Sequence, residues 1–210
     1  MTVIADYRLV PEVKFPEPVE DIRDAIAWFL SNTAAVAAAG ALPSGAQLDR
    51  IVVMGHSAGS NHVSTLFLSE DVLPLSSPVR AATCGLVPKG GAFKFVFGGP
   101  PMLPGNVLEE YYGSQEATLL KMPTALVAGA SEALIKSLPD VFVLRSEREP
   151  ATIQAACDDF VRDLETRRGG KIRYDIMQGH NHISPHMALM TGEGEQWAET
   201  VAEWVKITVN

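Results

Sequence analysis

Short apolar runs alternate with longer segments of helical periodicity along this chain, and this order constrains the fold more than any other feature. A chain that alternates strand and helix in this way typically forms a parallel sheet with helices packed on its faces. We therefore expect an α/β protein, and a length of 210 residues favours a single domain. The expected strands are residues 2–9, 50–55, 79–87, 140–146 and 171–177.

Four segments have the spacing of amphipathic helices, and they comprise residues 18–32, 58–69, 152–170 and 195–207. The third is the clearest, because it places five apolar residues on one face and ends at a pair of glycines. Those five residues are Ile153, Ala156, Phe160, Val161 and Leu164. Residues 88–123, which contain glycines, prolines and several aromatic residues, are expected to form an irregular excursion.

Composition and charge exclude several classes of protein. A net charge of −8 argues against a surface for nucleic acid or anionic membranes, since both need a basic face. No apolar run reaches the roughly 18 residues of a membrane span. The start of the chain lacks the pattern of a signal peptide, which favours a cytoplasmic location. Cys84 and Cys157 lie in apolar surroundings, so we expect two buried free thiols rather than a disulfide, and neither a metal site nor a cofactor.

The segment Gly-His-Ser-Ala-Gly, residues 55–59, lies between an expected strand and an expected helix. In a nucleophile elbow, a serine occupies the tip of such a turn, and flanking glycines are needed because side chains there would collide with the strand and the helix. The turn exposes the hydroxyl of Ser57 and directs the N–H of Ala58 toward a developing oxyanion. The alternative is an ordinary serine in a glycine-rich loop.

A serine hydroxyl needs a base, and five histidines are available: His56, His62, His180, His182 and His186. The segment that holds the last three follows the final expected strand, so it leaves the sheet at the same edge as the elbow. We choose His182 as the base, with His180 as its rival and a polar surface loop as the alternative explanation. His56 and His62 are expected to pack or to line the pocket.

The base in turn needs a carboxylate to orient it. In this order of elements, the acid follows the strand that precedes the histidine segment. Glu149 stands just after the strand at 140–146 and 33 residues before His182, which leaves room for one helix and one strand. Glu147 and Glu132 are rival candidates, with surface charges as the alternative explanation of both.

Five motifs in this order resemble α/β-hydrolases of the hormone-sensitive-lipase-like and ferulic-esterase-like carboxylesterase group, which is also similar to kynurenine formamidases. They are DYRLVPEVKFPEPVEDIRDAIAWF, GHSAG, YYGS, SEREP and GHNHIS. By this resemblance, which covers nearly the whole chain, the fold is an α/β-hydrolase fold with a mostly parallel sheet flanked by helices. The resemblance implies that Ser57 is the nucleophile, His182 the base and Glu149 the acid, although the family usually has an aspartate there.

The resemblance further implies that residues 88–139 form much of a cap over the acyl pocket. The aromatic residues expected to form its apolar wall are Phe93, Phe95, Tyr111 and Tyr112, with simple core packing as an equal alternative. Phe93, Tyr111 and His56 are the residues we expect to bind substrate.

One departure concerns the oxyanion site. Proteins of this group have a His-Gly-Gly segment upstream of the Tyr-Arg-Leu block, whereas Tyr7 is only six residues from Met1 here. We therefore expect a truncated hydrolase that lacks the first strands, with a gap in the sheet or direct pairing of the strands at 2–9 and 50–55. One missing oxyanion donor costs about 10²–10³ in rate.

The predicted function is a serine hydrolase that cleaves a small carboxylic ester, or an activated amide, through an acyl-enzyme. The alternative is an impaired remnant that only binds a small ligand or a partner chain. A homodimer, or another chain that supplies the missing strands, is a further hypothesis. The sequence does not indicate the acyl or alcohol preference.

Overall fold

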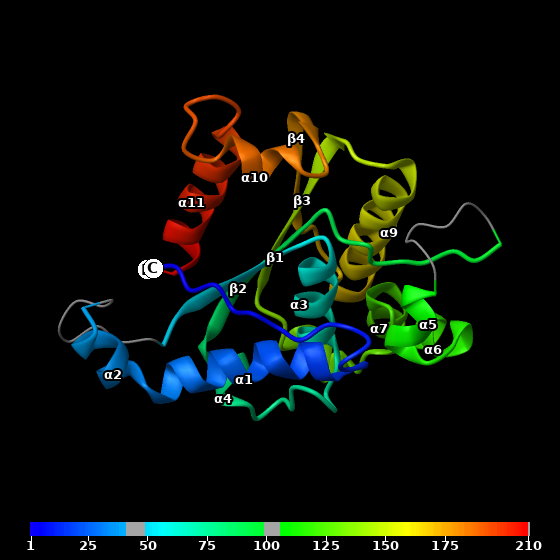
Figure 1. Cartoon of the computed structure of the whole chain (residues 1–210), viewed down its shortest axis with the longest axis horizontal. Coiled ribbons are helices and arrows are strands. Elements are labelled where there is room, and N and C mark those ends of the chain that lie inside the picture. Colours follow the sequence, from blue (N-terminus) through cyan, green and yellow to red (C-terminus); the bar gives the residue numbers. More distant parts are fainter. Residues whose placement is uncertain (41–48, 99–105, 210) are drawn as a thin grey trace.

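Four parallel strands form the centre of the fold in a computed structural model that describes residues 1–40, 49–98 and 106–209 (Figure 1). Their order in the sheet is the order in the chain: β1 (Ile51–His56), β2 (Thr83–Lys89), β3 (Asp140–Arg148) and β4 (Arg173–Asn181). Because all four strands are parallel, their carboxyl ends meet at one edge, and the loops after them lie close together.

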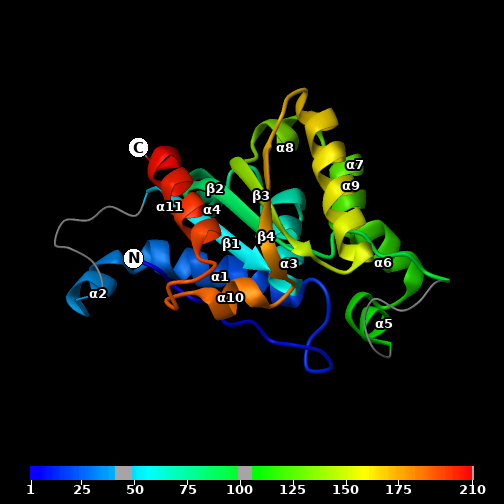
Figure 2. The same ribbon diagram turned by 90° about the horizontal axis from the view of Figure 1, so that it is seen from above.

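Successive side chains of each strand point to opposite faces of the sheet, and each face has its own apolar cluster. The larger cluster lies between the sheet and α1 (Glu17–Ser31), α3 (Ala58–Leu68), α7 (Pro123–Gly129) and α9 (Ala151–Arg168). The smaller one lies between the opposite face and α11 (Gln196–Thr208). Figure 2 shows α11 on one side of the strands and α3 and α9 on the other.

The helix expected at 152–170 is confirmed as α9. All five apolar residues predicted for its inner face are buried. The helix ends where Gly169 adopts a left-handed conformation, with φ of 68°, in which a side chain would be strained. The helices expected at 18–32, 58–69 and 195–207 correspond to α1, α3 and α11.

The prediction of a strand at residues 2–9 is wrong. This segment pairs with no strand among the described residues, and most of its side chains are exposed. Its backbone is hydrogen-bonded by side chains instead: the N–H of Arg8 donates to Asp21 Oδ2, and the Arg8 guanidinium binds the same carboxylate at 2.7 Å. Asp21 belongs to α1, so the segment is anchored to a helix rather than to the sheet.

The strand expected at 79–87 begins later than predicted. Its first residues form the short helix α4 (Pro78–Ala82), because Pro78 suits a first helical turn and the Ser77 side chain caps the N–H of Val79. The strand itself starts at Thr83 and continues to Lys89.

The excursion expected at 88–123 is partly helical. Residues 99–105 of it lie outside the described residues. From residue 107 onward the chain forms four helices before β3: α5 (Val107–Tyr112), α6 (Gln115–Lys121), α7 and α8 (Glu132–Lys136). The short helix α10 (Ser184–Ala188) follows β4. Val127 of α7 is fully buried in the larger cluster, so the segment 88–139 contributes to the core as well. The short helix α2 (Thr33–Ala38) follows α1.

Candidate active site

Ser57 occupies the tip of a sharp turn between β1 and α3. Its φ of 54° and ψ of −117° place a non-glycine residue in a region of backbone space that costs roughly 1–3 kcal/mol. The turn depends on Gly55, because a Cβ at that position would lie 2.4 Å from the carbonyl oxygen of Gly59. The N–H of Ser57 donates to the carbonyl of Lys89 at 3.0 Å, which ties the turn to the end of β2.

The hydroxyl of Ser57 is the first member of a hydrogen-bonded series. His182 Nε2 lies 2.9 Å from Ser57 Oγ, and His182 Nδ1 lies 2.7 Å from Glu149 Oε2. Since a carboxylate can only accept, Nδ1 carries the ring proton, and Nε2 is left to accept a proton from the hydroxyl. A series of this kind can remove the serine proton and stabilise the imidazolium that results.

The carboxylate of Glu149 is held in a confined position. Its side chain is fully buried, and Oε1 accepts a hydrogen bond of 3.4 Å from the N–H of Ser146. Gly90 borders it on the other side: a Cβ there would lie 2.9 Å from Glu149 Oε1 and 3.5 Å from the ring of His182, and its φ is +55°. A side chain at position 90 would therefore disturb both groups.

The rival histidine lies elsewhere. His180 Nε2 lies 2.8 Å from the carbonyl of Gly194, and Nδ1 lies 3.0 Å from Ser184 Oγ. Both ring nitrogens are thus engaged in holding the loop after β4, and neither contacts Ser57. Glu147, a rival acid, accepts a hydrogen bond of 2.7 Å from the N–H of Gly179.

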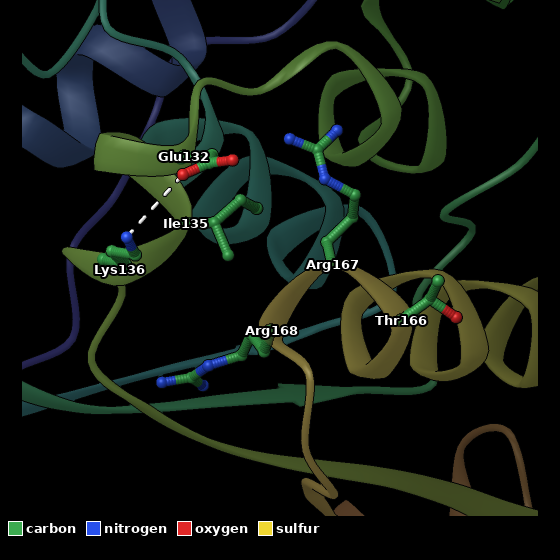
Figure 3. A pocket seen from close by; sticks show the side chains of 6 residues that line it. All are labelled: Glu132, Ile135, Lys136, Thr166, Arg167 and Arg168. Carbon is green, nitrogen blue, oxygen red and sulfur yellow. Dashed lines mark ion pairs between the residues drawn. The ribbon is translucent and has the colours of Figure 1, made fainter.

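Glu132, the third candidate acid, borders a surface pocket that Figure 3 shows from close by. It forms an exposed ion pair with Lys136 at 3.6 Å. The other residues around this pocket are Ile135, Thr166, Arg167 and Arg168. Arg168 ends α9, whereas Glu149 precedes its start, and 18 helical residues span about 27 Å. The pocket is therefore remote from Ser57.

His56 and His186 lie against His182. The ring centroid of His56 is 4.7 Å from that of His182 and 4.4 Å from that of His186. His56 Nε2 donates to the carbonyl of His182 at 2.9 Å, which helps to hold the backbone of the proposed base. Burial, then the charge of Lys89, lowers the pKa of His56 to about 4, and the same two causes lower the pKa of His186.

Ala58 is the first residue of α3, and the first intrahelical hydrogen bond of this helix runs from Asn61 to the carbonyl of Ser57. The N–H of Ala58 is therefore among those that the helix itself leaves without an acceptor. His62, one turn further, is buried, and its Nδ1 lies 3.2 Å from the hydroxyl of Tyr111. Burial lowers the pKa of His62 to about 4.

The four aromatic residues expected to form the apolar wall differ in burial. Phe93 is fully buried and stacks on Phe160 with ring centroids 4.2 Å apart, so core packing explains its position and corrects the expectation that it contacts substrate. Phe95 and Tyr112 are also buried. Tyr111 keeps partial exposure and is the one of the four that contacts a histidine of α3.

Sequence reasoning missed Lys89 and Gly90. Both lie where β2 ends, and they border Ser57 and Glu149 through the contacts given above. The available signal was a lysine that follows directly on the apolar run Gly-Leu-Val-Pro and precedes two glycines. Cys84 and Cys157 are free thiols, the first half-buried and the second buried.

Two absences concern the described part of the chain alone. No group of three or more histidine, cysteine or acidic side chains comes together there as a metal site would require. No helix in the ranges 1–40, 49–98 and 106–209 combines the length and the apolar character needed to cross a bilayer.

Comparison with known proteins places this geometry in context. Residues 1–86 match the family of the α/β-hydrolase fold, a span that contains Ser57 but neither Glu149 nor His182. An arylesterase of Saccharolobus solfataricus is 42% identical over 81 residues, which are 37% of this chain and 24% of that protein.

Solved esterases share the fold over almost the whole chain. Carboxyl esterase 2 of the fungus Tuber melanosporum has a TM-score of 0.70 and 19% identity, covering 98% of this chain and 66% of its own. A hyperthermophilic esterase of the archaeon Pyrobaculum calidifontis has a TM-score of 0.70 and 22% identity, covering 96% and 62%. The chain thus spans less than two thirds of these relatives. It has the α/β-hydrolase fold, with similarity to esterases of the hormone-sensitive-lipase-like group.

Proposed function

We propose that the chain is a serine hydrolase that cleaves a small carboxylic ester, or an activated amide, through an acyl-enzyme. The observation that carries the proposal is the series from Ser57 Oγ through His182 to Glu149, with distances of 2.9 and 2.7 Å. The names of the relatives, an arylesterase and carboxylesterases, support an ester as the substrate class.

In the proposed mechanism, Ser57 Oγ attacks the carbonyl carbon while His182 Nε2 takes the hydroxyl proton. Glu149 stabilises the imidazolium through Nδ1–H, and the N–H of Ala58 donates to the tetrahedral oxyanion. His182 then gives its proton to the leaving alcohol, which departs as the acyl-enzyme forms. A water molecule, deprotonated by the same ring, releases the acid and restores Ser57.

Ser57→Ala tests this mechanism. We expect turnover of a p-nitrophenyl ester to fall to background while the far-UV circular dichroism spectrum stays unchanged, because the side chain removed is the one that forms the covalent bond. Ser76→Ala is the matched control, since Ser76 is an exposed serine outside the site and its loss should leave turnover intact.

A fluorophosphonate probe gives a second readout that does not depend on the choice of ester. We expect one label, on Ser57, in the wild type and in Ser76→Ala, and none in Ser57→Ala. Turnover that survives in Ser57→Ala would overturn the mechanism. A folded wild-type protein that neither labels nor turns over would favour a binding module instead.

Four further expectations belong to this proposal. Part of the segment 88–139 covers the acyl pocket, with Tyr111 and His56 beside the substrate. The protein acts without nucleic acid, in keeping with its net charge of −8. A homodimer and a cytoplasmic location stay predictions.

A further inference from the structure

Lys89 is fully buried, which is unusual for a lysine. It is the last residue of β2, and its Nζ lies 4.0 Å from the centroid of the Trp197 ring of α11. Its Nζ has no hydrogen-bond partner among the described residues. A buried ammonium without hydrogen bonds is costly, and the contact with an aromatic face offsets only part of that cost.

The register of the sheet places Lys89 beside His56. Lys89 and His56 are partners across β2 and β1, so their side chains lie on the same face of the sheet. His56 contacts His182 and His186 through ring centroids 4.7 and 4.4 Å away. The backbone of the same lysine accepts the hydrogen bond from the Ser57 N–H.

The charges around Lys89 come from several elements. Burial lowers the pKa of Lys89 to about 8, and the carboxylate of Glu149, after β3, opposes that shift. Burial is the larger cause that lowers the pKa of His56 of β1 and of His186 of α10, and the charge of Lys89 is the next cause for both. On β4, Asp175 is two strands away in the same row and is paired with Arg173 at 3.0 Å.

A proton on His56 would affect the reaction directly. During turnover His182 must become an imidazolium, and a second cationic ring 4.7 Å away would repel it. A protonated His186, whose ring contacts that of His56, would also disfavour the imidazolium form of His182. The buried ammonium of Lys89, which is the cross-strand neighbour of His56, opposes the binding of these protons.

Given the proposed function, we propose that Lys89 is a positioning residue: its buried ammonium reinforces burial in keeping His56 and His186 uncharged, and so preserves the action of His182 in acid. Lys89 acts through the two histidines and not on the reacting atoms. The proposed roles of Ser57, His182 and Glu149 do not by themselves require a cation at this position.

The test compares the wild type with Lys89→Met, which keeps an unbranched stem against Trp197 and removes the charge. Histidine signals are followed by NMR from pH 4 to 9 in protein with ¹³C-labelled histidine. We expect the midpoints of His56 and His186 to rise by about one pH unit in Lys89→Met. Lys136→Met is the matched control, because it removes an equally positive but exposed lysine and should leave both midpoints unchanged.

The pH profile of ester turnover is the second readout. We expect kcat/KM of Lys89→Met to fall on the acid side about tenfold more than that of the wild type, with little change near pH 8. A lysine that served packing alone would reduce kcat/KM by the same factor at every pH. Equal histidine midpoints in the two folded proteins would overturn the inference.

The wild type provides a test that needs no variant, because the inference requires a charged Lys89 and a neutral His56 over the same pH range. Lys89 should lose its proton near pH 8 and His56 should stay neutral to about pH 4. A wild-type His56 that titrates near 6.5 would overturn the inference. These titrations need no turnover, so a protein that fails to label at Ser57 would refute the proposed function while the role of Lys89 toward His56 is still decided.

Discussion

A buried cation lies at each end of β2, and the two differ in whether their terminal nitrogens are hydrogen-bonded. Arg80, in the helix just before the strand, is 5% exposed, and its guanidinium donates to the carbonyls of Phe67 and Leu73 and to Ser137 Oγ. Lys89, at the other end, is 0% exposed, and its Nζ has no hydrogen-bond partner in the described chain.

This difference separates a structural charge from one placed for chemistry. The carbonyl of Phe67 lies in the last turn of α3, where the helix dipole favours a cation, so Arg80 connects this helix end to the loop that follows. Nothing comparable compensates Lys89. A buried charge that the fold does not satisfy is expected mainly where function requires it, and Lys89 borders Ser57 and His56.

The largest expected effect lies at the Lys89 end, in Glu149→Gln. The amide keeps the size of the carboxylate but removes the charge that orients His182, so we expect kcat/KM to fall about 10³–10⁴-fold, or roughly 4–5 kcal/mol in the barrier. The free energy of unfolding should change little. Ester turnover and urea unfolding measure the two quantities. Glu147→Gln is the control, because Glu147 accepts its hydrogen bond from the backbone N–H of Gly179 and not from His182. Near-normal turnover in Glu149→Gln would exclude this carboxylate from the reaction.

The sequence could predict features that depend on neighbouring residues or on chain order, but not those that depend on contacts between strands. The turn at Ser57 and the helix α9 follow from local pattern, because glycine spacing and helical periodicity are properties of neighbouring residues. Chain order predicts that the segments holding Glu149 and His182 reach the same edge as Ser57. It leaves Glu147 and His180 as rivals, which only the hydrogen bonds of the structure separate.

The features that sequence reasoning missed depend on contacts across strands. Lys89 lies beside His56 only because of the register between β1 and β2, and no periodicity in either strand encodes that pairing. The segment 2–9 has the apolar pattern of a strand, yet a strand needs a neighbour, and the side chain of Asp21 binds its backbone instead. Phe93 could equally have been core or pocket, and its stacking on Phe160 decides for the core.

The next largest effect is expected at the Arg80 end. Arg80→Met removes the donors for two buried carbonyls, so we expect the free energy of unfolding to fall by about 3 kcal/mol. Turnover per folded molecule should stay unchanged, because Arg80 lies at the opposite end of β2 from Ser57. Urea unfolding together with active-site titration separates stability from activity. A loss of turnover in the folded fraction would contradict the division between a structural and a functional end.

The last expected effect is that of Lys89→Met on stability, and its size depends on pH. The pKa of Lys89 falls from 10.5 to about 8 on folding, so between these values the unfolded chain binds a proton that the folded chain does not. The penalty of this group is therefore complete below pH 8 and disappears as pH approaches 10.5, a change of at most about 3 kcal/mol. Lys89→Met should thus be the more stable protein at pH 7, with an advantage that shrinks toward pH 10. Because thiols and tyrosines titrate in both proteins alike, the difference between the two unfolding free energies isolates Lys89. A difference that does not vary with pH would mean that Lys89 keeps its ordinary proton affinity, and the two buried cations would then be alike.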